Sequence, residues 1–288
     1  MRSLVSSFNF ATSVDIVRCA LTKGFTSGAV GLPVLPEIAG RVIALANDAN
    51  TEIEDLCKLI EQDQTLAANV LRYANSAAFA VGEPVVSLHD AMMRMGMTMV
   101  SGIAVAACLD GKEFHAPAYD NYRRRVRAHA LLAAGLSREL ARRKRCSVDM
   151  VFMCALMHTI GKPVVLRLLT DVQKQSHVRV AEVDAVMLAE EYEVTAARTA
   201  VNAWNLPRHV QVAAVHYHNP GDAPEFRREI TVTALASRLA AWVAESDPAA
   251  AVAVRALREW HDLEFEPDAI EELMELTQRM RYSPADFF

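Results

Sequence analysis

One histidine and one lysine lie within a long apolar stretch, Val151–Leu166. His158 and Lys162 are four residues apart, so they would share a face if helix continued through the intervening Gly161. Apolar neighbours bury this segment and therefore hold the imidazole in a fixed place. His158 is either a hydrogen-bonded histidine of the core or part of a functional site, and an imidazole in such a site suits a metal ion such as zinc.

Gly161 is costly at this position, because glycine in a helix interior loses roughly 1 kcal/mol relative to alanine. We expect close packing against a neighbouring helix to compensate. A site on this segment would then be positioned by helices that approach each other closely.

Composition and charge exclude several classes of protein. The chain has 288 residues, of which 52% are hydrophobic and 23% charged, and its net charge is -5. This balance is ordinary for a folded soluble protein and gives no general attraction to nucleic acid or anionic membrane. No apolar run reaches the roughly 18 residues of a membrane span, and Met1–Ala11 lacks the apolar core of a signal peptide. We therefore expect a cytoplasmic protein.

The cysteines are odd in number and show no C-x-x-C spacing, which is typical of reduced thiols in a cytosolic protein. They are Cys19, Cys57, Cys108, Cys146 and Cys154. Cys154 lies in the apolar run, where burial would raise its pKa and make the thiol inert.

Hydrophobic periodicity predicts an all-α fold. Helices are expected from Glu37 to the Asn47–Asn50 segment, from a Thr51–Glu54 capping box, and from Ser87 as an N-cap. The loop candidates are 23–28 and 81–84. In the second half, the helical patterns cover 122–144, 148–169, 182–204, 209–218, 226–245 and 267–280.

Several sequence motifs resemble those of a known family. His158, Gly161 and Lys162 fit the His-Asp-x-Gly-Lys motif of HD metal-dependent phosphohydrolases, but Thr159 stands where that family has aspartate. Further motifs resemble the HDOD domain, an HD-related output domain of bacterial signalling proteins. They are Leu32-Pro-Val-Leu-Pro36, Ile60-Glu-Gln-Asp63, Leu71-Arg-Tyr-Ala-Asn-Ser-Ala77, Ser87–Ala91 with Met95-Gly96, and Trp204-Asn-Leu-Pro207.

The resemblance covers roughly Thr26–Ala244 and implies the domain organisation. We expect an N-terminal segment (1–25), an HDOD unit (26–245) and a C-terminal helical extension (246–288). The HDOD unit would consist of two packed helical bundles, residues 30–112 and an HD-like bundle of residues 118–245.

The resemblance also indicates which residues would line the pocket. In HD enzymes, histidines and aspartates hold one or two metal ions, which activate water and polarise phosphate. The candidates that occupy this vestigial pocket are His129, His158, Thr159, Lys162, Glu193, His218 and Ser237. Thr159 and Ser237 carry neutral hydroxyls where the family carries carboxylates. No catalytic residue and no cofactor is therefore expected, although a lone divalent metal on His158 remains an alternative.

The function expected from these motifs is regulation without catalysis, through binding of a signalling protein or a small ligand. One alternative is a metal-dependent phosphohydrolase acting on nucleotides or cyclic dinucleotides. Another is a nucleic-acid-binding regulator that uses the basic clusters Arg123–Arg127 and Arg142–Arg145. A solvated face explains these clusters more simply, so Arg123, Arg124, Arg142 and Arg143 are expected to be mostly exposed, and neither nucleic acid nor membrane is an expected partner.

Overall fold

The described part of the chain is all-α. The structure is a computed structural model that describes residues 12–48, 50–75, 83–109, 111–245 and 250–280. No strand occurs within these ranges. Ser76–Ala77 of the Leu71–Ala77 motif, part of the expected 81–84 loop, and residues 1–11 and 281–288 lie outside them.

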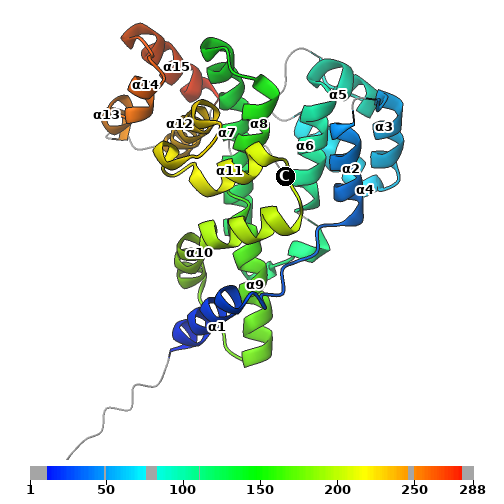
Figure 1. Cartoon of the computed structure of the whole chain (residues 1–288), viewed down its shortest axis with the longest axis vertical. Coiled ribbons are helices and arrows are strands. Elements are labelled where there is room, and N and C mark those ends of the chain that lie inside the picture. The colour runs from blue at the N-terminus through cyan, green and yellow to red at the C-terminus, as the bar shows by residue number, and fades with distance from the viewer. Residues whose placement is uncertain (1–11, 49, 76–82, 110, 246–249, 281–288) are drawn as a thin grey trace, which may run out of the picture.

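The first half of the chain forms a layer of short helices (Figure 1). They are α2 (Glu37–Asn47), α3 (Ile53–Glu61), α4 (Gln64–Ala74), α5 (Leu88–Met95) and α6 (Met97–Cys108). Side-chain caps define the starts of α4 and α5: Asp63 accepts from the Thr65 and Leu66 amides, and Ser87 accepts from the Asp90 amide, as predicted for Ser87. The predicted Thr51–Glu54 capping box is displaced by one residue, because Glu52 and Asp55 form the box instead.

The second half contains the longer helices, which cross around His158. They are α7 (Asp120–Lys144), α8 (Val148–Met157), α9 (Gly161–Ser176), α10 (Glu182–Ala203), α11 (Arg208–His216) and α12 (Arg227–Glu245), with short helices η1 (Lys112–Phe114), η2 (Pro117–Tyr119) and η3 (Pro220–Asp222) between them. Helix α7 packs along both α8 and α12, and α9 packs along α10. His158 ends α8, and a short turn separates it from α9.

Two further pieces cover the ends of this second bundle. Helix α1 (Ser13–Ser27) lies against α9 and α10 (Figure 1) and continues through the expected 23–28 loop, because Gly28 in left-handed conformation is its C-cap. At the other end, α13 (Ala250–Arg255), α14 (Arg258–Asp262) and α15 (Pro267–Arg279) pack on α12. Trp260, 2% exposed, joins these last helices to the main core.

Buried apolar side chains run continuously from the first bundle into the second. One core cluster includes Val100 and Ile103 of α6, Phe152 of α8 and Leu239 of α12. The Val148–Ser176 segment is apolar and long enough to span a membrane, but 83% of its most apolar window is buried. Such burial is typical of a core helix in a soluble protein.

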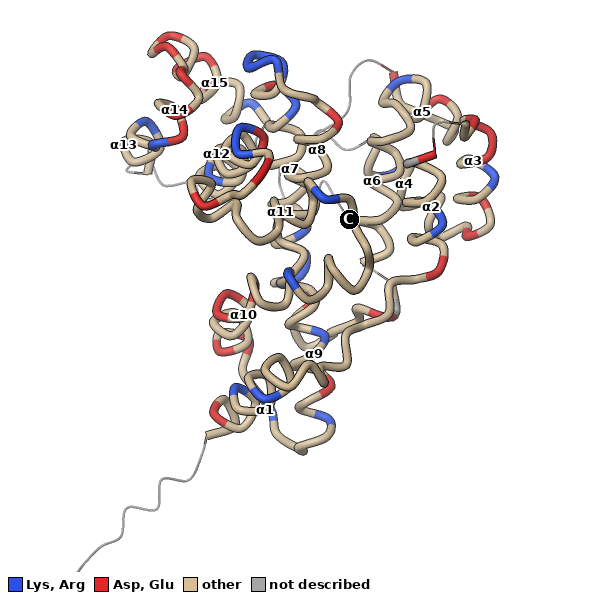
Figure 2. The backbone as a smooth tube through the Cα atoms, in the orientation of Figure 1, with Lys and Arg blue, Asp and Glu red and all other residues tan. Residues whose placement is uncertain are grey.

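The distribution of charge corrects one expectation. Figure 2 shows basic and acidic residues side by side on many elements. Arg142 and Arg143 are exposed as predicted, but Arg124 is only partly exposed and the Arg123 side chain is 11% exposed. The prediction for Arg123 was wrong because this side chain lies under the start of α7, where it pairs with Asp120 and approaches the Leu109 carbonyl.

Candidate functional site

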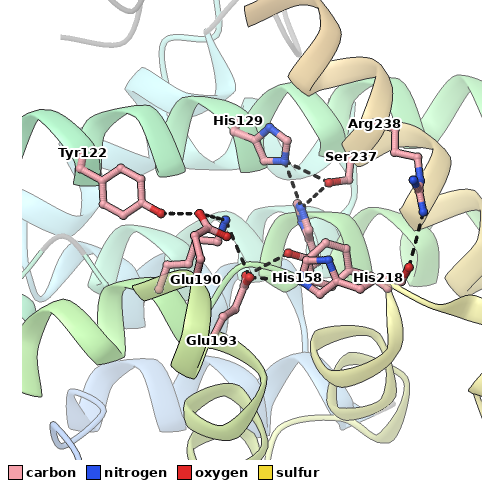
Figure 3. A network of polar contacts seen from close by, with 10 residues as sticks. Tyr122, His129, His158, Glu190, Glu193, His218, Ser237 and Arg238 are labelled. Carbon is pink, nitrogen blue, oxygen red and sulfur yellow. Dashed lines mark hydrogen bonds and ion pairs between the residues drawn. The ribbon is translucent and has the colours of Figure 1, made fainter. Parts of the chain in front are cut away.

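Three polar side chains from three helices meet in the middle of the second bundle. His129 comes from α7, His158 from the end of α8 and Ser237 from α12 (Figure 3). The two imidazole Nε2 atoms lie 3.2 Å apart, and Ser237 Oγ lies 3.1 Å from that of His129 and 3.0 Å from that of His158. We call this group the histidine–serine triangle.

One assignment of donors and acceptors accounts for the hydrogen bonds of the triangle. His158 Nδ1 lies 2.6 Å from the Ala155 carbonyl oxygen, which can only accept, so Nδ1 carries the proton and Nε2 of the neutral ring accepts. The Ser237 hydroxyl can donate to that nitrogen while it accepts from His129 Nε2–H. The Nε2 atoms of both histidines and the Ser237 hydroxyl then all have a partner.

Both imidazoles are held neutral. Burial, followed by the positive charge of Lys162, lowers the pKa of His129 to about 4. Burial and then His129 lower the pKa of His158 well below its usual value. His158 is fully buried. Neutral, hydrogen-bonded rings are what a structural polar centre requires.

A second polar group lies next to the triangle. Glu193 on α10 accepts a 2.9 Å hydrogen bond from Tyr217 OH and lies 3.1 Å from His218 Nε2 and 3.7 Å from Lys162 Nζ. Lys162 donates to Glu190 at 2.8 Å, and Glu190 also accepts from Tyr122 at 2.7 Å. We call these six residues the carboxylate network; Figure 3 labels four of them.

Glu193, at the centre of the carboxylate network, is buried, and neighbouring side chains compensate its charge. Glu193 is 1% exposed, and Tyr217, His218 and Lys162 supply two hydrogen-bond donors and a cation to it. Burial alone would raise the pKa of Glu190, but the hydrogen bonds from Lys162 and Tyr122 outweigh it and lower that pKa. Burial, with the nearby glutamates, raises the pKa of both Tyr122 and Tyr217, which keeps the two phenols as neutral donors.

An aromatic contact joins the two groups. The rings of His158 and Tyr217 meet edge to face with centroids 4.6 Å apart, and the Tyr217 and His218 rings lie 3.9 Å apart. Behind His218, Arg238 reaches the His218 carbonyl at 3.4 Å and pairs with Glu259 of α14 at 2.8 Å. His218 is half exposed and opens onto a cleft of about 220 Å³ between η3, α12 and α14.

Gly161 explains how Lys162 reaches this network. A Cβ atom there would lie 2.0 Å from the Glu193 carbonyl oxygen and 3.1 Å from the Ala197 amide nitrogen. The prediction that close packing compensates for the glycine is confirmed. Only glycine allows α9 and α10 to approach this closely at the residue next to Lys162.

Most of the candidate residues come together, but Thr159 takes no part in either group. It is 4% exposed and lines a separate cavity between the two bundles, facing Tyr73 and Ala106 rather than Ser237. His216 is partly exposed and outside both groups, and burial raises the pKa of the Cys154 thiol as predicted. The candidates predicted from the sequence did not include Tyr122, Glu190 or Tyr217. Tyr122 shares a helix face with His129 at a spacing of seven residues, and Glu190 shares one with Glu193 at a spacing of three.

The donor atoms of the triangle do not fit a two-metal phosphohydrolase centre. Such a centre needs carboxylates to hold and bridge the ions. The triangle offers two neutral imidazoles and a hydroxyl, while the oxygens of Glu190 and Glu193 bind Lys162, the two tyrosines and His218. Across the described ranges, no group of three or more His, Cys, Asp or Glu side chains is placed to hold a metal. Nucleophilic catalysis by Ser237 is also disfavoured, because the residue is 8% exposed and its partner His158 is fully buried.

Comparison with known proteins identifies the relatives of this chain. A family model described as the HDOD domain matches residues 32–220. An uncharacterized protein of Treponema pallidum (strain Nichols) is 23% identical over 205 residues, which are 67% of this chain and 39% of that protein. The chain therefore spans well under half the length of that curated relative.

Solved structures share the fold. A presumed metal-dependent phosphohydrolase from Shewanella amazonensis SB2B is 16% identical with a TM-score of 0.70, covering 96% of this chain and 99% of that one. An HDOD domain protein of unknown function from Geobacter sulfurreducens gives 16% identity and a TM-score of 0.65 over 96% and 98% of the two chains. A presumed signal transduction protein from Marinobacter aquaeolei VT8 is 21% identical with a TM-score of 0.60, covering 96% of this chain and 65% of that one.

Proposed function

The chain belongs to the HDOD domain family, and on that premise we propose that it is a non-catalytic signal-transduction protein of the bacterial cytoplasm. It acts by binding a signalling protein or a small ligand and passing on regulation. Reduced cysteines, the burial of the Val148–Ser176 segment and the name of the Marinobacter aquaeolei relative support this role. The net charge of -5 disfavours nucleic acid and membrane as partners.

One observation carries the proposal: His129, His158 and Ser237 hydrogen bond to one another, and neither imidazole contacts a carboxylate in the part of the chain described. The position that would supply a metal-bound carboxylate supplies a hydroxyl that satisfies the histidines instead. We infer that the site is degenerate and that this polar centre now stabilises one arrangement of α7, α8 and α12.

The alternative is a metal-dependent phosphohydrolase, as the name of the Shewanella amazonensis relative suggests for that protein. Glu193 is the candidate carboxylate to replace the missing metal ligand, but both of its oxygens are hydrogen bonded to neighbouring side chains. A lone zinc ion on the two imidazoles is the metal-bound state most compatible with these donors. The enzyme would then have to act without the clamp of two ions.

A substrate panel distinguishes the two functions. The purified chain is incubated with nucleotide mono-, di- and cyclic phosphates and with magnesium, manganese, iron or zinc in turn, beside the His158→Ala variant. We expect no turnover above that variant. Thr159→Asp alone is expected to remain inactive, because Thr159 faces the cavity between the bundles rather than the triangle. Turnover that disappears in His158→Ala would establish the enzyme and end the regulatory proposal.

A further inference from the structure

A cavity of about 60 Å³ lies between the two helical bundles. Tyr73 of α4 and Ala106 of α6 border it on one side, and residues of α7 and of the α8–α9 turn border it on the other. At about 10–15 Å³ for each water-sized group, it has room for roughly four to six such groups. Its walls are mostly aliphatic: Leu109, Val126, Leu131, Leu156, Ile160 and Leu166.

One hydroxyl group of this lining has no hydrogen-bond partner. Thr159 is 4% exposed, yet its hydroxyl makes no hydrogen bond within the described ranges. Threonines in helices commonly donate to the carbonyl oxygen four residues earlier, as Thr170 and Thr231 do here. For Thr159 that oxygen belongs to Ala155, and it accepts from His158 Nδ1–H at 2.6 Å instead. A buried hydroxyl without a partner is unfavourable, so Thr159 offers the cavity an unused donor and acceptor.

The charged residues at the cavity do not favour a charged ligand. Arg123 and Arg127 of α7 border it. Arg123 pairs with the Asp120 carboxylate at 3.0 Å, and Arg127 also interacts with other groups of the protein. A charged molecule would lose its hydration on entering this apolar space, and that loss is far larger than for a neutral molecule. An uncharged ligand therefore matches the lining better than an ion does.

We propose that this cavity binds a small uncharged aliphatic molecule that carries one hydroxyl or carbonyl oxygen. The oxygen forms a hydrogen bond with the Thr159 hydroxyl, and the aliphatic part lies among the leucine and isoleucine side chains. Ligand pockets are commonly apolar concavities between structural units with a few placed polar groups, and this one has both features. The site is separate from the histidine–serine triangle, because Thr159 and His158 face different surroundings.

The location indicates what such a ligand would regulate. A molecule bound there touches both bundles at once, so it favours the arrangement that keeps α4 and α6 close to α7. This regulatory consequence rests on the proposed signalling function, whereas the binding itself does not. A failure of binding and a discovery of phosphohydrolase activity would therefore be separate results.

Amide ¹⁵N–¹H spectra of the full chain, recorded during titration with three probes, test the proposal. 1-Butanol carries the aliphatic chain and one hydroxyl, 1-chlorobutane carries the chain without the hydroxyl, and butanoate carries the chain with a charge. We expect 1-butanol to shift the amides of Ala106 and Thr159 saturably, with a Kd on the order of 1–10 mM. Butanoate should bind at least about tenfold more weakly, because its charge must be desolvated.

Two variants locate the binding. Ala106→Leu fills the cavity from α6 and should abolish binding of 1-butanol, while Ala44→Leu on the exposed face of α2 is the matched control and should bind as wild type. Thr159→Val keeps the side-chain shape and removes only the hydroxyl. It should weaken 1-butanol about fivefold and leave 1-chlorobutane as tightly bound as before, because only the alcohol loses a hydrogen bond.

The Thr159→Val comparison decides the proposal even if Ala106→Leu does not fold, since a general disturbance of the cavity would weaken both probes alike. Four results would overturn the proposal. They are the absence of saturable 1-butanol binding, butanoate binding as tight as that of 1-butanol, wild-type binding by folded Ala106→Leu, and a Thr159→Val variant that either binds 1-butanol as wild type or loses both probes equally.

Discussion

A Cβ atom on Gly161 would lie 2.0 Å from the carbonyl oxygen of Glu193. The two backbones of α9 and α10 therefore touch at the residue beside Lys162, and this contact sets the 3.7 Å separation between Lys162 Nζ and Glu193 Oε2. The glycine and the carboxylate network belong to one arrangement. A substitution at Gly161 or in the carboxylate network should therefore lower the stability of the second bundle.

Gly161→Ala should destabilise the protein by roughly 2–3 kcal/mol, because the added methyl group meets backbone atoms of α10 that cannot rotate away. Gly40→Ala is the matched control. Gly40 also lies within a helix, α2, but nothing lies within 4 Å of its would-be Cβ, so this change should be neutral or stabilise by up to about 1 kcal/mol. Urea unfolding measures both. Equal free energies of unfolding for the two variants would show that the close approach is absent.

Lys162→Met should cost roughly 2–4 kcal/mol, because it leaves Glu193, which is 1% exposed, without its cation. Glu193→Leu should recover part of this loss when it is combined with Lys162→Met, since the unpaired charge is then gone. Arg279→Met removes an ion pair whose two side chains are 76% and 68% exposed and should change stability by less than about 1 kcal/mol. Strictly additive losses in the double variant would contradict the pairing.

Stability should fall as the pH drops from about 6.5 to about 4. The pKa of His129 is about 4 in the folded protein and about 6.5 when unfolded, so the unfolded state binds more protons between these values. For this one group the loss is roughly 3 kcal/mol at the acid end of the window. Urea unfolding at pH 7.5 and 4.5 should show a smaller pH effect for His129→Gln than for wild type. His261→Gln, whose side chain is 94% exposed, should retain the wild-type effect.

Much of the fold could be predicted from sequence because local signals and tertiary structure agree. The helical patterns, the Ser87 cap and the packing role of Gly161 all depend on residue types whose effects are local or strongly steric. The Thr51–Glu54 capping box was wrong by one residue, because Glu52 is the N-cap and its amide donates to the Asp55 carboxylate. The 23–28 segment was predicted as a loop but is helical up to Ser27, because the left-handed C-cap that ends α1 is Gly28.

The site could be predicted only in part. His129, His158 and Ser237 were proposed from a resemblance, but no local pattern states that their three polar atoms lie within 3.2 Å of one another. Thr159 follows His158 directly, yet successive residues around a helix end point in different directions, so it faces the cavity between the bundles instead. Arg123 illustrates the same limit, because its burial depends on how the start of α7 meets Leu109.

We propose that the histidine–serine triangle is a neutral hydrogen-bonded centre rather than a metal-binding catalytic one. Long-range ¹⁵N–¹H correlation spectra of the imidazoles at pH 7, with and without equimolar zinc or magnesium, test it most directly. We expect His158 to be neutral with its proton on Nδ1, His129 to be neutral, and neither to change when metal is added. Ring-nitrogen shifts of both histidines on metal addition, absent in a Ser237→Ala variant that remains folded, would contradict the account and identify the triangle as a metal site.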